Sequence, residues 1–492
     1  MIVALLAVGL LQQPARSAAW IPLGSHADRA LLWALDAGAL PRLDPLTRPW
    51  RLAAARAALE TADTTLDATR WARDAVAALD DTTALVAEAG LSAYRDGGSE
   101  PMRAAGASGI ALGGGLRAQI GGRNWVAVAN PAFDDRWRDD PTYTGYRGGP
   151  VTGRLIEGYL ALTGAVGDVS FGRMARNWGP ASVAGLQLSS IAAAGDQIAG
   201  ALRYGRFELL AIAQRLDDRD TLAAVRYQRW FVGHRLVMRL GEASWLALSE
   251  TGVYGGPGAG FDPAMHLPVG LALLNEINDG RDFNALLGAD AAIRLPGRAR
   301  LELAGFIDDI QVDDSALTDE RPASYGLSAG VVLPLGRLPL HLDVRYTRIA
   351  SLAYRNSFEP HLLYGVKDIG IGRNAADFDE SRVRLSWKPA ARLDVLAEVT
   401  YLRQGSYDFR QPFPPDSVLA QPGQGFLVAP VRHASMGRVA GIAELANGLG
   451  LRGELGVVRT LTGSSRGIAS AAVSFCLNAL TRRGCNGFTA LP

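Results

Sequence analysis

The segment "SRVRLSWKPAARLDVLAEVTYLR" (residues 381–403) contains two runs in which apolar and polar side chains alternate. The first run alternates Val383, Leu385 and Trp387 with Arg382, Arg384, Ser386 and Lys388. The second places Leu393, Val395, Ala397, Val399 and Tyr401 opposite Asp394, Glu398 and Thr400. Because successive side chains of a β-strand point to opposite faces, both runs predict strands with one apolar and one polar face.

The same alternation recurs after Gly90, most cleanly in "LHLDVRYTRIA" (340–350) and less cleanly in "RLELAGFID" (300–308) and "GLRGELGVV" (450–458). Two architectures fit this pattern. A soluble antiparallel sheet would turn the apolar face to a core, whereas a transmembrane barrel would turn it to lipid. At about 10 residues per strand, plus turns and loops of similar total length, residues 91–475 allow about 16 to 20 strands. We expect about eighteen.

Three features favour the barrel. Charged residues of both signs occupy the polar face, as a crowded aqueous lumen requires. Short turns such as "WKPAARLD" alternate with long polar loops such as 134–150, 254–263 and 405–431. Aromatic residues recur near strand ends, as an interfacial girdle requires. The sequence therefore predicts a mainly β fold, a large antiparallel transmembrane β-barrel over residues 91–475.

The N-terminal part has a different character. Residues 1–19 contain an apolar run that is too short to span a bilayer and suits a signal peptide, with export to the bacterial outer membrane as the consequence. Residues 20–90 are rich in Ala, Leu, Arg and Asp and predict an α-helical bundle, with a third helix that continues to Gly90. Residues 476–492 show no strand pattern and read as a tail. This tail holds Cys476 and Cys485, the two cysteines of the chain, which either pair or belong to a dispensable segment.

Several function classes find no support. The 50 basic and 49 acidic residues are balanced, which gives no electrostatic case for nucleic acid. G-x-S-x-G, H-E-x-x-H and P-loop patterns are missing, and the six histidines have no metal spacing. Acidic pairs such as Asp308-Asp309 could be glycosidase carboxylates or calcium ligands, but paired Asp is also common at turns. We expect neither catalysis nor a cofactor nor a metal site.

Several motifs, taken in chain order, carry a family resemblance. "FGRMARNWGPASVAGLQLS" (171–189) has a Gly-Arg pair before Trp-Gly-Pro and then a strand that ends in Leu-Ser. It resembles the signature of capsule-assembly Wzi family proteins. "WIPLGSHADRALLWALDAGALPRLDPLTRPWRLAAARAAL" (20–59) is similar to the family's helical segment with its "TRPW"-like entry. Residues 233–256, 267–293, 302–314 and 365–385 resemble later family segments in the same order.

The resemblance implies a monomeric outer-membrane barrel of about eighteen strands with a periplasmic helical bundle. It further implies a lectin that holds capsular polysaccharide at the cell surface. Two positions depart from the family pattern: Asn177 stands where a second Trp is usual, and Ser190-Ile191 stands where an Asn pair is usual. The identity of the sugar therefore cannot be carried over.

Two long loops have the composition of a sugar-binding surface, with aromatic faces for CH groups and planar polar side chains for hydroxyls. If the loops are extracellular, we expect the polysaccharide to bind there, because loops carry function more often than the scaffold does. The alternative is that their aromatic residues pack on one another. The candidate residues are Trp137, Arg138, Tyr143, Tyr146, Arg147, Tyr407, Asp408, Phe409 and Arg410.

Four further positions are predicted to have structural roles. Glu242 and Glu250 flank "ASWLALS" at an even spacing, which predicts that both face the lumen and pair with arginines there. Arg173 is also expected in the lumen. Trp178 is expected to pack at the lipid face or at the barrel rim, before Gly179-Pro180 ends the strand pairing.

Three hypotheses follow. The first is a polysaccharide-binding barrel whose partners are capsular polysaccharide or exopolysaccharide, outer-membrane lipid and the barrel-assembly machinery. The alternative is a porin-like channel for small solutes, which differs from the first in having an open lumen. A third is a secreted glycoside-active enzyme with a soluble β fold.

Overall fold

The computed structural model describes residues 18–79, 83–95, 107–192, 194–220, 225–268, 270–274, 282–309, 321–336, 338–356, 360–419, 421–445 and 448–478. Residues 1–17 of the predicted signal peptide and residues 479–492 of the predicted C-terminal tail therefore lie outside the described residues. Within those described ranges, no helix is long and apolar enough to cross a membrane.

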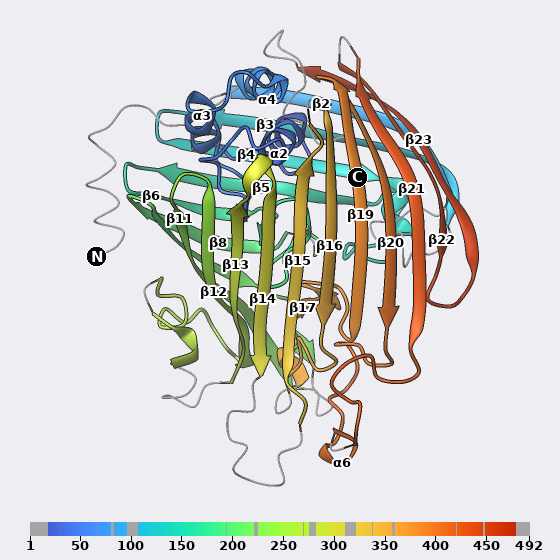
Figure 1. Cartoon of the computed structure of the whole chain (residues 1–492). Helices are drawn as coiled ribbons and strands as arrows, with labels where there is room; N and C mark the ends of the chain where they lie inside the picture. Colours follow the sequence, from blue (N-terminus) through green and yellow to red (C-terminus); the bar gives the residue numbers. More distant parts are fainter. Residues whose placement is uncertain are drawn as a thin grey trace.

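Eighteen antiparallel strands form the wall of a closed barrel, which confirms the predicted fold (Figure 1). The barrel closes where β2 pairs with both β3 and β23. A two-residue strand, β10 (Arg219–Asp220), extends the sheet beside β11. The wall strands are β2 (Thr83–Arg95), β3 (Ser108–Gly121), β4 (Trp125–Asp134), β5 (Gly153–Thr163), β6 (Gly167–Arg173), β8 (Asp196–Tyr204), β9 (Phe207–Arg215), β11 (Arg226–Leu240), β12 (Ser244–Pro257), β13 (Phe283–Arg294), β14 (Arg300–Asp309), β15 (Ser324–Pro334), β16 (Leu340–Ile349), β19 (Phe378–Ala390), β20 (Leu393–Gln404), β21 (Arg432–Glu444), β22 (Leu449–Arg459) and β23 (Ser465–Asn478).

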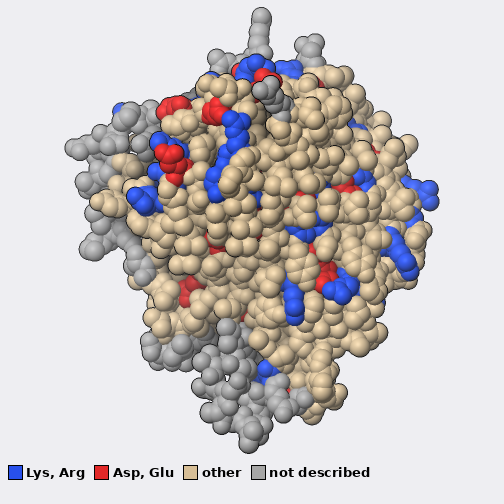
Figure 2. Space-filling view, in the orientation of Figure 1, with Lys and Arg blue, Asp and Glu red and all other residues tan. Residues whose placement is uncertain are grey.

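The alternation read from the sequence is the alternation between lipid and lumen. In β16, Val344 is exposed on the outer wall while its neighbours Asp343 and Arg345 are buried inside. The outer wall is consequently apolar, and Figure 2 shows broad areas without charge below the charged residues that gather over the helices. Apolar side chains are stable there because lipid, not water, covers them.

The two ends of the barrel differ. At the end that carries the helices, strands are joined by short turns such as 205–206 and 391–392. At the opposite end lie the long connections 135–152, 174–195, 258–282, 350–377 and 405–431. This asymmetry is typical of outer-membrane barrels, in which short turns face the periplasm.

The helical part is shorter than predicted. It consists of α2 (His26–Asp36), α3 (Leu52–Glu60) and α4 (Asp67–Ala77). The predicted third helix ends at Ala77 rather than Gly90, because "TALVAEAGLSAYR" (83–95) alternates with period two and forms β2. The barrel therefore begins at Thr83 instead of residue 91.

Helix α2 covers one mouth of the barrel. The Arg300 guanidinium at the start of β14 donates to the Leu35 carbonyl at 2.9 Å and to Asp36 at 2.6 Å. The Trp33 ring stacks on the inward-facing His341 ring with centroids 3.9 Å apart. These contacts fix the helix against the inner wall.

Two of the long connections turn back into the lumen. Segment 174–195 contributes β7 (Asn177–Trp178), which pairs with β1 (Thr47–Arg48) from the helical part. Segment 350–377 contributes the hairpin of β17 (Gly365–Val366) and β18 (Ile369–Gly370). Both segments belong to the largest apolar cluster of the molecule, which also includes inward side chains such as Phe231 and Val253.

The pairing of β1 with β7 joins two of the motifs that carry the family resemblance. Thr47 lies opposite Trp178 and Arg48 lies opposite Asn177. "TRPW" is thus not the start of a helix, because its Thr47 and Arg48 form β1 and α3 begins only at Leu52. The C-terminal boundary also differs from the prediction, since β23 continues to Asn478, and its Cys476 is disulfide-bonded.

Candidate functional site

The aromatic residues predicted for sugar binding in loop 135–152 are mostly packed away. Trp137 is 2% exposed and stacks on Tyr143 with centroids 5.8 Å apart. The Arg154 guanidinium also lies over the Trp137 ring, 4.4 Å from its centroid, and the Tyr143 hydroxyl donates to the Gly153 carbonyl at 2.8 Å. Tyr146, by contrast, is 79% exposed. Of the three aromatic residues, only Tyr146 offers its ring to solvent.

The two predicted arginines of this loop hold its backbone. Arg138 donates to the carbonyls of Gly149 and Pro150, both at 3.1 Å. Arg147 donates to the carbonyls of Arg138, Asp140 and Tyr143 at 2.5–2.8 Å. Both guanidinium groups therefore have a structural use.

Loop 405–431 shows a similar division of roles. Phe409 is 1% exposed and belongs to the apolar core of the lumen. The half-buried Tyr407 donates its hydroxyl to Gln424 at 2.8 Å and lies 5.5 Å from the Arg355 guanidinium. Arg410 forms an ion pair with Asp408 at 2.7 Å.

Both predicted loops contact the hairpin of β17 and β18. The ammonium group of Lys367, in the hairpin of β17 and β18, donates to the Thr144 carbonyl at 2.8 Å. At the next residue of the hairpin, Arg410 donates to the Asp368 carbonyl at 2.7 Å, and Arg219 pairs with the Asp368 carboxylate at 2.6 Å. Loops far apart in the sequence thus form one polar surface at the long-loop mouth of the barrel.

All four predicted structural positions, Trp178 among them, lie elsewhere than expected. Arg173 pairs with Asp196 at 2.8 Å at the half-exposed outer rim, not in the lumen. Glu242 lies in the exposed turn between β11 and β12. Glu250 lies on the outer wall, since its neighbours Ser249 and Thr251 face inward. The even spacing therefore does not place the two glutamates on one strand face, because Glu242 precedes the first residue of β12, Ser244.

Trp178 and its neighbours leave the wall entirely. Phe171 is exposed on the outer face, and Gly172 then adopts a φ of +126°, a conformation that favours glycine. The chain turns inward from there, so Trp178 is buried in the lumen rather than at the rim. Its ring lies against Gly233, where a Cβ atom would come within 3.0 Å.

Ion pairs link the inner faces of several strands, but through other glutamates than those predicted. Glu302 is fully buried and accepts from Arg300 at 2.8 Å and from Arg345. Glu398 accepts from Arg384 at 2.7 Å and from Arg438 at 2.9 Å. The first set of pairs joins β14 to β16, and the second joins β20 to β19 and β21.

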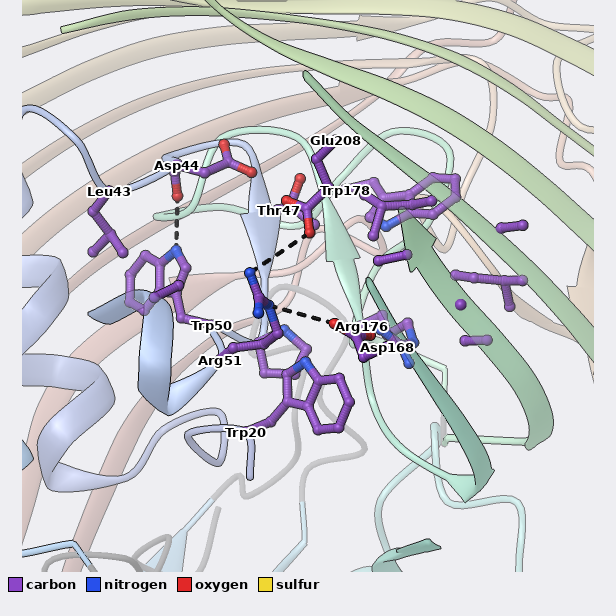
Figure 3. Close-up of a pocket in the computed structure, with 18 of the residues that line it drawn as sticks. Trp20, Leu43, Asp44, Thr47, Trp50, Arg51, Asp168, Arg176, Trp178 and Glu208 are labelled. Atoms are coloured by element: carbon purple, nitrogen blue, oxygen red, sulfur yellow. Dashed lines mark hydrogen bonds and ion pairs between the residues drawn. The ribbon is translucent and has the colours of Figure 1, made fainter. Parts of the chain in front are cut away.

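A cavity of about 190 Å³ lies between the helical part and the wall strands β6, β8, β9 and β12 (Figure 3). Its walls include the rings of Trp20, Trp50 and Trp245. At its centre, the Arg51 guanidinium lies between two carboxylates, with Nε 3.6 Å from Asp168 and Nη2 4.0 Å from Glu208. The cavity is further lined by Arg42, Leu43, Asp44, Thr47, Pro49, Ala54, Arg176, Trp178, Ala199, Gly200, Ala201, Leu210, Ala211 and Ile212.

The polar residues of this cavity are held by the surrounding structure. Arg176 donates to Gln197 at 2.6 Å and to Ser170 at 3.3 Å. The Asp44 carboxylate accepts from the Leu46 amide at 2.7 Å, and burial raises the pKa of Asp44 to about 6. Sequence reasoning missed this site because its residues come from four distant segments. The only local signal was the aromatic and basic "TRPW" (47–50).

Among the described residues, no group of three or more His, Cys, Asp or Glu side chains is arranged to hold a metal ion. The side chains that line the cavity are aromatic rings, guanidinium groups and carboxylates. Such groups can form hydrogen bonds and stacking contacts with a neutral polar ligand.

Comparison with known proteins agrees with this architecture. The family model of the capsule assembly protein Wzi matches residues 122–358. The fold is similar to that of Wzi from Escherichia coli, described as an outer-membrane protein involved in group 1 capsule assembly and as a carbohydrate-binding β-barrel. That structure has a TM-score of 0.66 and 13% identity, and the match covers 93% of this chain and 99% of the other.

Two barrels from Pseudomonas aeruginosa also match. The outer membrane protein OpdK has a TM-score of 0.47 and 13% identity, over 80% of this chain and 99% of its own. OccK3 (OpdO) has a TM-score of 0.47 and 11% identity, and the match covers 82% of this chain and 98% of OccK3. No curated protein matches the chain by sequence.

Proposed function

We propose that this chain, a member of the capsule assembly protein Wzi family, is an outer-membrane barrel that binds polysaccharide and helps to attach or assemble capsular polysaccharide or exopolysaccharide at the cell surface. The family match spans residues 122–358, which include the segment that folds into the lumen. The E. coli barrel of similar fold is described as carbohydrate-binding, which supports the same ligand class for this chain.

The filled lumen favours this proposal over a porin-like channel. Tyr354 and Tyr364 donate their hydroxyls to the carbonyls of Leu186 and Gln187, both at 2.6 Å, and so fasten the two inward segments together. Helix α2 covers the opposite mouth. A channel for small solutes needs an aqueous path through the barrel, and these segments occupy that space.

Orientation follows from the two different ends. The helices and short turns face the periplasm, and the long loops face the outside. The polar surface formed by loop 135–152, the hairpin of β17 and β18, and loop 405–431 then meets the polysaccharide at the cell surface. The protein acts there as a monomer without catalysis, surrounded by outer-membrane lipid after insertion by the barrel-assembly machinery.

Deletion of the gene tests the proposal. A deletion strain should still make polysaccharide but release it into the medium, and a plasmid copy should restore surface retention. Measuring cell-bound and free polysaccharide by uronic acid or total hexose assay separates the two pools. If the deletion strain keeps its polysaccharide on the cell surface, the proposed function is wrong.

A further inference from the structure

One long connection at the loop end of the barrel folds back against the outer wall. Segment 258–274 follows β12 and appears in Figure 1 as the green loop at the lower left, outside the strands. Its Met265 and Ala272 side chains are fully buried in a cluster with wall residues such as Val232. The segment, rather than bare strands, therefore forms the outer surface of this part of the wall.

The end of this segment lies at membrane depth. Its backbone reaches Glu250, which stands six residues after Ser244, the first residue of β12 at the periplasmic end. With a rise of about 3.3 Å per residue and a tilt of about 40°, Glu250 is roughly 15 Å above the periplasmic rim, inside an apolar band about 25 Å tall. Leu287, the register partner of Glu250 on β13, is exposed on the lipid face directly beside it.

The side of the segment that faces away from the wall is also apolar. The stretch "LPVGLALL" (267–274) contains no polar or charged side chain. Leu267, Leu271 and Leu274 are 43%, 53% and 49% exposed. So many exposed leucines on one short stretch are unfavourable in water. At membrane depth they meet acyl chains instead, as the exposed Leu287 of the neighbouring strand does.

Four backbone N–H groups of this stretch have acceptors within the protein, as lipid requires of an irregular segment. The N–H groups of Ala272 and Leu273 donate to the Glu250 carboxylate at 2.8 and 2.7 Å. The N–H groups of Gly270 and Leu274 donate to carbonyls of the segment itself at 2.9 and 3.2 Å. Glu250 thus supplies, on the lipid face, the acceptor that water supplies to an ordinary loop.

The start of the segment lies higher, at the level of the lipid head groups. Tyr254 stands ten residues after Ser244, which is roughly 25 Å above the periplasmic rim by the same rise and tilt. The His266 ring lies 3.0 Å from the Tyr254 hydroxyl and stacks on Phe261 with centroids 4.7 Å apart. Trp230 of β11 meets the Phe261 ring edge-on at 5.8 Å. Because aromatic rings gather at the interfaces of outer-membrane barrels, the segment descends from an aromatic layer into the apolar band.

We propose that residues 267–274 form a re-entrant segment that inserts into the outer leaflet and contacts lipid acyl chains, with Glu250 as its anchor on the wall. The partner is the hydrocarbon of the lipid rather than a head group, because the stretch carries no charge. This placement is independent of the polysaccharide ligand. Its failure therefore leaves the proposed function intact, and failure of the proposed function leaves the insertion intact.

Site-directed spin labelling measures the surroundings of the segment. Leu271→Cys places a nitroxide on it, and Leu287→Cys is the lipid-facing control on β13. Ser417→Cys, at an exposed position of loop 405–431, is the water-facing control. The full-length protein is reconstituted in dimyristoylphosphatidylcholine vesicles. Power-saturation EPR then compares the access of oxygen, which dissolves in lipid, with that of nickel ethylenediaminediacetate, which stays in water. Wild-type protein treated with the same label gives the background, and its Cys476 is disulfide-bonded.

The oxygen-to-nickel ratio at Leu271→Cys should match that at Leu287→Cys and exceed that at Ser417→Cys several-fold. Adding Glu250→Ala should lower the ratio at position 271 toward the water-facing value, because two backbone N–H groups then lack their acceptor. Adding Glu242→Ala, in an exposed turn, should leave the ratio unchanged. If the Glu250→Ala background does not fold, as judged by heat-modifiable migration on a gel, Leu271→Cys alone decides. Leu267→Cys takes its place if Leu271→Cys does not fold.

A ratio at Leu271→Cys equal to that at Ser417→Cys overturns the insertion, because the leucines then lie in water. Low access of both reagents also overturns it, because protein then covers the leucines. Spin–spin broadening between labels would identify that protein as a second copy of this chain. A lipid-like ratio that Glu250→Ala leaves unchanged overturns the anchoring role of Glu250 and supports the insertion itself.

Discussion

His234 and Glu250 face each other across β11 and β12 on the outer wall of the barrel, with His234 Nδ1 3.1 Å from Glu250 Oε2. The carboxylate also accepts the backbone N–H groups of Ala272 at 2.8 Å and Leu273 at 2.7 Å. Around this pair, Val232 and Phe283 of the wall pack against Met265 and other apolar residues of segment 258–274. The pair therefore fastens an external segment to the wall. A buried carboxylate without hydrogen-bond partners would be unfavourable at this position.

Glu250→Ala should release segment 258–274 from the wall. The change leaves two backbone N–H groups and His234 without their acceptor, at a cost of about 1–3 kcal/mol per buried group. In proteoliposomes, chymotrypsin should cleave the variant near Phe261 or Leu271 faster than the wild type. Glu242→Ala, in an exposed turn, is the control and should not change the cleavage rate. Equal cleavage of Glu250→Ala and wild type would show that the apolar contacts alone hold the segment.

The same segment should loosen at acidic pH. Burial lowers the pKa of His266 from 6.5 to about 4, and its ring stacks on Phe261 at 4.7 Å and lies 3.0 Å from the Tyr254 hydroxyl. The released segment binds a proton more readily than the docked one, so docking is strongest above pH 6.5 and weakens as the pH falls toward 4. The full loss is at most about 3 kcal/mol.

Hydrogen exchange of the amides in segment 258–274, measured from pH 7 to pH 4 and corrected for intrinsic exchange, checks this expectation. His266→Phe keeps an aromatic ring in the stack but cannot be protonated, so its protection should vary less with pH. A wild-type protein whose protection stays constant over this range would contradict the assignment to His266.

The sequence predicts those parts of the structure that depend on local contacts. Lipid contact forces every second residue of a wall strand to be apolar, so Val383 or Val399 can be placed from the pattern alone. The alternation of apolar and polar residues does not show which face of a strand is the lumen when an external segment covers a polar residue on the outer face. The pattern therefore predicts a strand around Glu250 but places its side chain on the wrong face.

Contacts between distant segments leave no periodic signal. The pairing of Thr47 with Trp178, and the cavity that forms beside it, depends on two irregular stretches meeting inside the barrel. Loop composition is equally ambiguous, because Trp137 and Tyr146 occur in the same short loop and only the fold buries one and exposes the other.

That difference between Trp137 and Tyr146 can be measured. Trp137→Ala removes a buried ring that contacts Tyr143 and Arg154 and should destabilise the protein by about 3–5 kcal/mol. Tyr146→Ala should leave stability unchanged within about 0.5 kcal/mol, because the ring is exposed. Under the proposed function, Tyr146→Ala should instead lower surface-retained polysaccharide several-fold. Thermal unfolding by heat-modifiable gel migration and the retention assay separate the two effects. If both variants retain as much polysaccharide as the wild type, this loop is not part of the binding surface.

Glu302→Ala tests the ion pairs of the lumen. Glu302 is fully buried between Arg300 and Arg345, and its removal leaves both guanidinium groups without their shared carboxylate. Breaking a buried pair in this way costs about 3–5 kcal/mol. Arg300 also holds α2, so protease access to the helical part should rise together with the loss of thermal stability. An unfolding temperature equal to that of wild type would show that water replaces the carboxylate without cost.

The filled lumen predicts that the wild-type protein carries no large, steady current in a planar bilayer. The hydroxyls of Tyr354 and Tyr364 fasten the inward segments, and each such hydrogen bond contributes about 1 kcal/mol. The double variant Tyr354→Phe, Tyr364→Phe keeps the packing but loses these bonds, so brief openings should become several-fold more frequent. Tyr346→Phe removes a hydroxyl that contacts Asp379 outside these segments, and it should behave as wild type. A large, constant conductance in the wild-type protein would contradict a filled lumen and favour the porin-like alternative.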